Sequence, residues 1–126
     1  MVDRKTDNIV VTIDGPAASG KSTVARKLAK NLAFIHLNSG ILFRAVALGA
    51  KEAGIDLDDE LAVANYAKSI TFEFSLLPDG STALFVDSNP VHEKLSSLDA
   101  GRLAGKIALL PSVRNALLIV QREAAT

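Results

Sequence analysis

Hydrophobic positions in the first third of the chain change from a short apolar run to a helical repeat. Residues 9–13 (IVVTI) are mostly β-branched and are followed by Asp-Gly-Pro at 14–16, a pattern that predicts a buried strand and then a turn. Val24, Leu28 and Leu32 recur every four residues with basic side chains between them, as in an amphipathic helix. We therefore expect a strand, a glycine-rich loop and a helix in this order.

A second strand and a second helix follow. The run 34–37 predicts another short strand, and Asn-Ser-Gly at 38–40 predicts a turn. Apolar residues at helical spacing over 41–48 mark a helix that ends near Gly54. Strands that alternate with helices are typical of the α/β class, so we expect a parallel sheet flanked by helices.

The middle of the chain has the pattern of a helix followed by a hairpin. Residues 58–68 are predicted to be helical, and apolar and polar residues alternate over 72–76 as in a half-buried strand. Pro-Asp-Gly at 78–80 is a strong turn signal, after which 83–86 can return as the antiparallel partner. We interpret this hairpin as a module inserted between the α/β elements.

Two further helices are predicted near the carboxyl-terminal end. Ser-Ser-Leu-Asp at 96–99 has the features of a helix start, and this helix is expected to run to about Leu109, although Gly101 and Gly105 lower its helix propensity. Pro-Ser at 111–112 opens the last helix, which carries an apolar stripe on one face.

Composition narrows the class of protein. The 126 residues are 48% hydrophobic and carry 14 basic and 14 acidic side chains, which favours one globular domain over a disordered chain. There is no cysteine, so disulfides and thiolate metal sites are excluded, and we interpret His36 and His92 as structural. The longest apolar run, 116–120, is far shorter than a membrane span. We expect a cytoplasmic protein.

The net charge of zero is the sum of three segments whose own net charges differ in sign. Residues 1–50 carry seven basic and three acidic side chains, a net of +4. Residues 51–100 have a net charge of −7, and residues 101–126 of +3. This asymmetry indicates that the two ends face something anionic while the middle is a solvated acidic module, although chance clustering of surface charge is the alternative.

The sequence GPAASGKS at 15–22 fits the phosphate-binding motif G-x-x-x-x-G-K-[ST] and lies between a predicted strand and a predicted helix. Its small residues let backbone N–H groups turn toward a polyphosphate at the positive end of the helix. Lys21 would reach the β and γ phosphates as the catalytic group, and the Ser22 hydroxyl would hold Mg²⁺. The predicted ATP-binding residues are Gly15, Ala17, Ala18, Ser19, Gly20, Lys21, Ser22 and Thr23.

The motif predicts nucleoside triphosphate binding and leaves the reaction open. Asp14 is either a turn residue or a partner of the loop or of a metal-bound water, and the two interpretations are equally favoured. A switch GTPase needs an Asn-Lys-x-Asp base reader, which is absent, and a motor ATPase needs a longer chain. A small phosphotransferase and a noncatalytic binding module remain.

A second motif resembles a known family. LNSGILFRA at 37–45, together with IDGPAASGKST at 13–23, is similar to bacterial cytidylate kinases, and PSVRNALLIVQRE at 111–123 resembles a helix of the same family. The resemblance implies a P-loop kinase-type fold with a small inserted hairpin and helix module. It divides the chain into a P-loop core (1–57), an inserted nucleoside-monophosphate-binding module (58–110) and a helix that returns to the core (111–126).

The same resemblance implies ATP-dependent phosphoryl transfer to CMP or dCMP, with ATP and Mg²⁺ bound and no nucleic acid or membrane partner. Ser39, Arg44 and Arg114 would contact the acceptor, with both arginines on its phosphate. A guanidinium offers permanently charged, bidentate donors that match phosphate oxygens, and the acceptor must be held in line with the γ phosphate.

The chain departs from the family pattern at three positions and in length. Asn38 stands where the family usually has aspartate, Phe43 where it has tyrosine, and Ser96 about where an acceptor arginine is common. Relatives of this kind continue with a lid that carries further arginines. We therefore expect the 126 residues alone to be nearly inactive, because phosphoryl transfer relies on such groups.

The same shortness has a structural consequence. The resemblance implies that, in the family's parallel sheet, a strand from the part beyond residue 126 lies between the two predicted strands. Without that strand, apolar strand edges would be unpaired, and such edges favour association between chains. We expect either repacking of this gap or pairing with a second copy. The alternatives to a kinase portion are a noncatalytic nucleotide-binding module and a structural domain with a vestigial loop.

Overall fold

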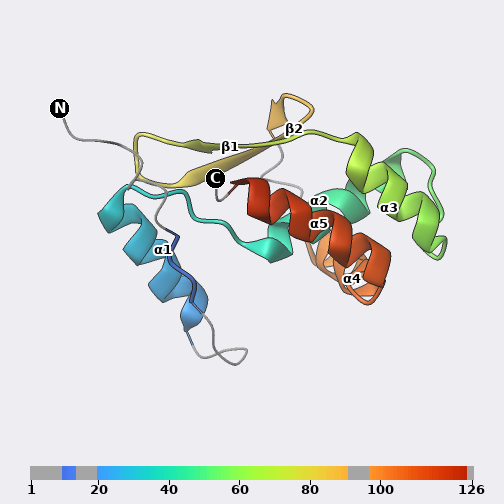
Figure 1. The fold of residues 1–126 in the computed structure, drawn as a ribbon, viewed down its shortest axis with the longest axis horizontal. Helices are drawn as coiled ribbons and strands as arrows, with labels where there is room; N and C mark the ends of the chain where they lie inside the picture. Colours follow the sequence, from blue (N-terminus) through green and yellow to red (C-terminus); the bar gives the residue numbers. More distant parts are fainter. Residues whose placement is uncertain (1–9, 14–19, 91–96, 125–126) are drawn as a thin grey trace.

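The computed structural model describes residues 10–13, 20–90 and 97–124 (Figure 1). This part of the chain forms helices and one small sheet. In chain order the elements are α1 (Lys21–Leu32), α2 (Ser39–Glu52), α3 (Glu60–Ser69), β1 (Phe72–Leu76), β2 (Thr82–Val86), β3 (Asn89–Pro90), α4 (Leu98–Ile107) and α5 (Pro111–Ala124). The α/β class and all five predicted helices are confirmed.

Polar side chains mark the starts of three helices. The Asn38 side chain accepts a hydrogen bond from the Gly40 N–H at the start of α2. Asp59 caps α3 and Ser97 caps α4 in the same way, each accepting from the N–H three residues later. Such caps satisfy N–H groups that have no partner within the helix, which is why these helices begin where they do.

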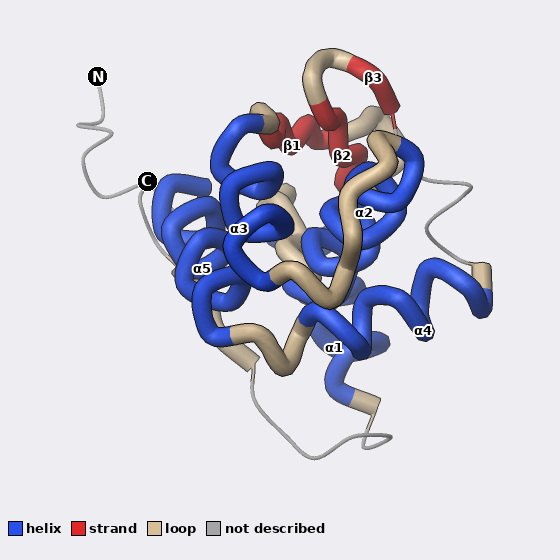
Figure 2. Tube along the Cα trace, turned by 90° about the vertical axis from the view of Figure 1, so that its right-hand side faces the viewer, coloured by secondary structure: helices blue, strands red, loops and turns tan. Residues whose placement is uncertain are grey.

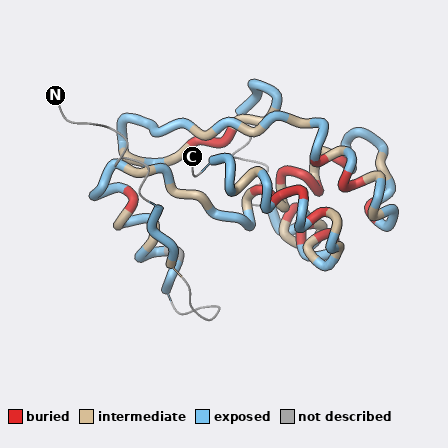
Figure 3. Tube along the Cα trace, viewed as in Figure 1, coloured by how far each residue is buried: buried red, intermediate tan, exposed pale blue. Residues whose placement is uncertain are grey.

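The hydrophobic core lies between the helices α2, α3, α4 and α5 and one face of the hairpin. Helix α2 packs most extensively on α4, and α3 packs on α5 (Figure 2). Most of the buried residues lie on these four helices, as Figure 3 shows, and the largest fully buried side chains come from all four. They are Leu42, Val46, Val63, Ile107, Val113 and Leu117.

The predicted hairpin is confirmed. β1 pairs antiparallel with β2, with Phe74 opposite Leu84, and the short β3 continues the sheet beside β2. Gly80 closes the turn at a φ of 86°, a left-handed conformation that glycine adopts without a steric cost. Leu84 is buried against the helices, so the hairpin forms one wall of the core.

The expected parallel strands are not formed in the described part of the chain. Residues 10–13 and 34–37 are not part of a sheet, and the sheet that does form is antiparallel. A strand needs a partner strand that pairs with its backbone N–H and C=O groups, and neither segment pairs with a strand among the described residues. Val10 and Val11 are accordingly 56% and 48% exposed instead of buried. The division of the chain at residues 58 and 111 stays a prediction.

Helix α1 lies to one side of the helical core (Figure 1). Among its described residues only Ala29 is buried, and it is 8% exposed. The Lys30 side chain lies over Gly80 in the hairpin turn, and the His36 N–H donates to the Thr82 hydroxyl over 2.8 Å. These contacts attach the end of α1 and the segment after it to the hairpin.

No single helix in the described residues is long and apolar enough to cross a membrane. Helices α4 and α5 reach that length only together, and they are bent by 107° at the break between them.

Candidate functional site

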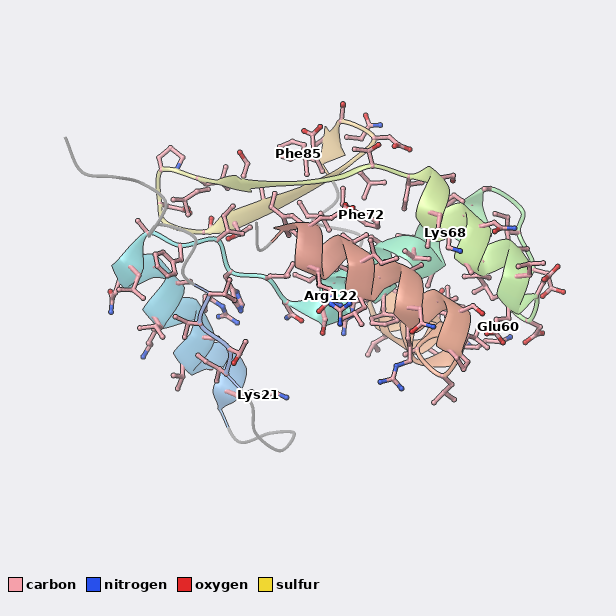
Figure 4. All side chains as sticks on the ribbon, in the orientation of Figure 1. Lys21, Glu60, Lys68, Phe72, Phe85 and Arg122 are labelled. Carbon is pink, nitrogen blue, oxygen red and sulfur yellow. The ribbon has the colours of Figure 1, made fainter. Side chains whose placement is uncertain are left out.

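The predicted donor site is described only at its helical end. Gly20 is the N-cap of α1 with a φ of 86°, so the chain enters the helix through a left-handed residue that favours glycine. Lys21 is the first residue of α1, and Figure 4 shows it at that end of the helix. Asp14 and the loop residues Gly15, Ala17, Ala18 and Ser19 lie outside the described residues, as does the side chain of Ser22.

The start of α1 has the chemistry that a polyphosphate requires. The first turn contains no acidic side chain, and the cap is a glycine that brings no side chain of its own. The N–H groups of that turn and the positive end of the helix dipole therefore favour an anion. Thr23 is exposed in the same turn. The described residues at this end of α1 thus fit a phosphate chain, and the role of Ser22 toward Mg²⁺ stays a prediction.

Two predicted acceptor residues lie on α2. Ser39 is its first residue and is exposed, directly after the Asn38 cap. Asn38 accepts from the Gly40 N–H over 2.9 Å with the same kind of oxygen that an aspartate would offer, so the departure from the family pattern changes the charge and leaves the cap in place. Arg44 is half-buried, and its guanidinium approaches Gly101 of α4.

The ring of Phe43 packs against the core cluster. The tyrosine that the family usually has at this position would place the same ring there and add a hydroxyl. Ser96, the third departure, lies outside the described residues. The structure therefore gives Phe43 a packing role and leaves the role of Ser96 a prediction.

The third predicted acceptor residue, Arg114, is exposed in the first turns of α5. The start of this helix is held by Glu60 of α3, whose carboxylate accepts from the Ser112 N–H over 3.0 Å. Hydrogen bonds from the backbone and side chain of Ser112 lower the pKa of Glu60. A carboxylate at a helix N-terminus also interacts favourably with the positive end of the helix dipole. The contact therefore holds the start of α5 against α3.

The predicted donor residues and the predicted acceptor residues lie on different helices. α2 and α5 belong to one packed cluster of helices, which holds Ser39, Arg44 and Arg114. α1 makes no extensive contact with any other described helix. The helices with the predicted acceptor residues therefore pack together, and α1 is not part of that packing.

Some contacts around the site were not predicted from the sequence. Asp58 and Lys106 form an ion pair of 2.9 Å between α4 and the segment before α3. Gly101 lies under the guanidinium of Arg44, and Gly49 lies under the ring of Tyr66. A glycine inside a helix is the sequence signal for such a close approach, but it does not identify the partner. No group of three or more His, Asp or Glu side chains is gathered for a metal ion within the described ranges.

Comparison with known proteins gives one family. A family model described as cytidylate kinase matches residues 11–126. The cytidylate kinase of Chromobacterium violaceum is 46% identical over 114 residues, which are 90% of this chain and 49% of that protein. Those of Haemophilus ducreyi and Pasteurella multocida are 41% and 36% identical, covering 93% and 96% of this chain and 52% and 53% of theirs. The chain spans about half the length of the curated relatives it matches. Because the match runs through nearly all of its residues, the chain belongs to the cytidylate kinase family.

Proposed function

We propose that the chain is the nucleotide-binding portion of a kinase that transfers the γ phosphoryl group of ATP to CMP or dCMP. The observation that carries the proposal is the family match over residues 11–126, which includes both the P-loop sequence and the acceptor motif on α2. In this reaction a phosphate oxygen of the acceptor forms a bond to the γ phosphorus, and the bond from that phosphorus to the β–γ bridging oxygen breaks. The products are ADP and CDP or dCDP.

On the donor side, the backbone N–H groups at the start of α1 bind the phosphate chain, and Lys21 neutralises charge on the β and γ phosphates. Ser22 is the residue that would hold Mg²⁺, which would neutralise charge on the phosphates, and Thr23 would add a hydroxyl near them. The glycine cap and the absence of acidic residues in the first turn of α1 support this assignment.

On the acceptor side, Ser39 binds the nucleotide and Arg44 and Arg114 bind its phosphate. Their permanent charge offsets the repulsion between two anionic nucleotides, and their fork geometry orients the attacking oxygen. The packing of α2 and α5 into one cluster supports a common role for these three residues. The separation of α1 from that cluster supports the further proposal that the 126 residues alone bind nucleotides but transfer phosphate very slowly.

Calorimetry of the chain with ATP and with CMP tests both sites. We expect Lys21→Ala to weaken ATP binding at least about 10-fold and to leave CMP binding unchanged. Arg44→Ala should weaken CMP binding by a similar factor and leave ATP binding unchanged, because each substitution removes one charge-assisted contact. Equal ATP binding by the wild type and Lys21→Ala would instead support a structural domain with a vestigial loop. A coupled assay on the uninterrupted gene product with CMP, dCMP, AMP, UMP and shikimate then decides the acceptor.

A noncatalytic nucleotide-binding module is the second candidate. The start of α1, with a glycine cap and no acidic side chain in its first turn, would serve nucleotide binding without catalysis as well. The intact mass of the protein in its source cell separates the two: a mass well above 13.3 kDa supports the kinase, and a mass of 13.3 kDa supports the module.

We also propose that the isolated chain associates with itself. Val10, Val11 and Ile35 are 56%, 48% and 45% exposed, and they lie in the two segments for which a parallel strand was predicted. Apolar, unpaired strand segments are templates for pairing between chains. Size-exclusion chromatography with light scattering should show a dimer or larger species at micromolar concentration, and a monomer would contradict this.

A further inference from the structure

Helix α4 presents small residues to α2. Ala100 and Ala104 of α4 are buried, and the packing of α4 on α2 is the most extensive between any two described helices. Small side chains let two helix backbones approach closely and leave room for a larger side chain from the other helix to lie across the contact. Gly101 follows Ala100 at the edge of this surface and is half-buried.

The larger side chain at this edge is Arg44. A Cβ atom added to Gly101 would lie 3.3 Å from the Nη2 atom of Arg44 and 3.6 Å from its Cζ atom. The first of these distances is tighter than an ordinary contact, so the guanidinium would have to shift by a few tenths of an ångström. A side chain at residue 101 would therefore displace the guanidinium from its present position.

A second glycine in the same helix provides the comparison. Gly105 lies one helical turn after Gly101, so the two share a face of α4. A Cβ atom added to Gly105 would meet nothing within 4 Å. Both glycines weaken the helix to a similar degree, and only Gly101 has a contact that a side chain would disturb.

We propose that Gly101 is a positioning residue for the acceptor phosphate, which acts by letting the Arg44 guanidinium rest against the backbone of α4. The role rests on the function proposed above, in which Arg44 binds that phosphate. A guanidinium held against a helix has few rotamers to lose when the phosphate arrives, and its fork is already oriented. The residue thus favours tight binding of a nucleoside monophosphate without touching it.

The test compares substitutions at the two glycines in the full 126-residue chain. Gly101→Leu should weaken CMP binding by about 10-fold relative to Gly105→Leu, and Gly101→Ala by about 2- to 3-fold relative to Gly105→Ala, the smaller side chain giving the smaller displacement. ATP binding should be the same in all four variants. Calorimetry with CMP and with ATP measures both quantities.

A double-mutant cycle separates positioning from general damage to the fold. In an Arg44→Ala background, Gly101→Leu should no longer change CMP binding beyond the effect of Gly105→Leu, because the group that it displaces is gone. The midpoint of urea unfolding, measured for the same four members of the cycle, reports the contact between residues 44 and 101 without any ligand.

The outcomes distinguish the two proposals. Equal loss of CMP affinity in Gly101→Leu and Gly105→Leu, or a loss that persists in the Arg44→Ala background, overturns the positioning role while the wild type still binds CMP. Failure of the wild type to bind CMP overturns the proposed function and the positioning role together, even if unfolding shows that the two residues are in contact.

Discussion

Helix α2 and helix α1 are similar in length and differ in how the chain surrounds them. α2 buries five residues, among them Leu42 and Val46, against three other helices. α1 has an amphipathic pattern as well, yet Val24 and Leu32 are more than two-fifths exposed. An apolar stripe therefore predicts that a helix has a face to bury, and only neighbouring elements decide whether that face is covered.

The same difference separates the two halves of the proposed site. The predicted acceptor residues lie on helices that form a packed core, whereas the predicted donor residues begin a helix whose other end contacts the hairpin turn. The core region can hold its side chains in fixed positions by packing. The region of α1 relies on local helix geometry and a few contacts, so its stability should be lower.

A matched pair of leucines gives the largest expected difference. Leu42 is 0% exposed and Leu32 is 45% exposed. Leu42→Ala should lower the free energy of unfolding by about 2–5 kcal/mol, because it removes buried methyl groups and leaves a cavity, and Leu32→Ala by less than about 1 kcal/mol. Urea unfolding of both variants measures this, and equal losses would show that α1 is packed as tightly as α2.

A second pair tests how closely α2 and α3 approach. A Cβ atom on Gly49 would overlap the Tyr66 hydroxyl and lie 3.1 Å from its Cζ atom. Gly49→Ala should therefore destabilise the chain by about 1–3 kcal/mol. Adding Tyr66→Phe should restore part of that loss because it removes the overlapping hydroxyl. Gly105→Ala is the control without a clash. If Gly49→Ala lowers the free energy of unfolding no more than Gly105→Ala does, α2 and α3 are farther apart at this point than the structure shows.

A third substitution strengthens α1 alone. Ala33 ends this helix with a φ of 55°, a left-handed conformation that favours glycine. Ala33→Gly should stabilise the end of α1 by up to about 1 kcal/mol. Amide hydrogen exchange should slow in α1 and stay unchanged in α2. Slower exchange in both helices would mean that the two regions unfold as one unit.

The smallest effect concerns acid stability of the core region. Hydrogen bonds from Ser112 hold the pKa of Glu60 below its usual value of 4.5. The unfolded chain therefore binds a proton here more readily than the folded one, so the contribution is complete above about pH 5 and is lost as the pH falls through the lowered pKa. Glu60→Gln should reduce this acid dependence, as seen in thermal unfolding between pH 7 and pH 3. Identical pH profiles would contradict it.

Much of the helical architecture was predictable because its signals are local. Caps at Asn38, Asp59 and Ser97 and the Pro-Asp-Gly turn at 78–80 fix element ends through contacts within a few residues. The strands predicted at 9–13 and 34–37 depend on a neighbour that sequence pattern does not provide, and in the described residues they are not strands. Pairing of distant segments is the part that local reasoning misses.

The candidate site, too, could be predicted from local motifs but not from contacts between distant segments. The P-loop spacing and the positions of Ser39, Arg44 and Arg114 come directly from motifs, whereas their environment comes from packing. That Gly101 underlies Arg44 follows from the way α4 crosses α2, which no pattern around residue 44 indicates. The charge pattern, with basic ends and an acidic middle, is compatible with a pocket that binds an anion and does not locate that pocket.

The hydrogen bond from the His36 N–H to the Thr82 hydroxyl joins residues that are 46 positions apart. Its formation must close a loop that contains α2, α3 and β1, and the entropy cost of that closure is met most easily after those elements have already assembled. The segment between α1 and α2 should therefore become ordered late in folding and be released early in unfolding. On this basis the segment between α1 and α2 reaches its final position only after α2, α3 and β1 have packed together.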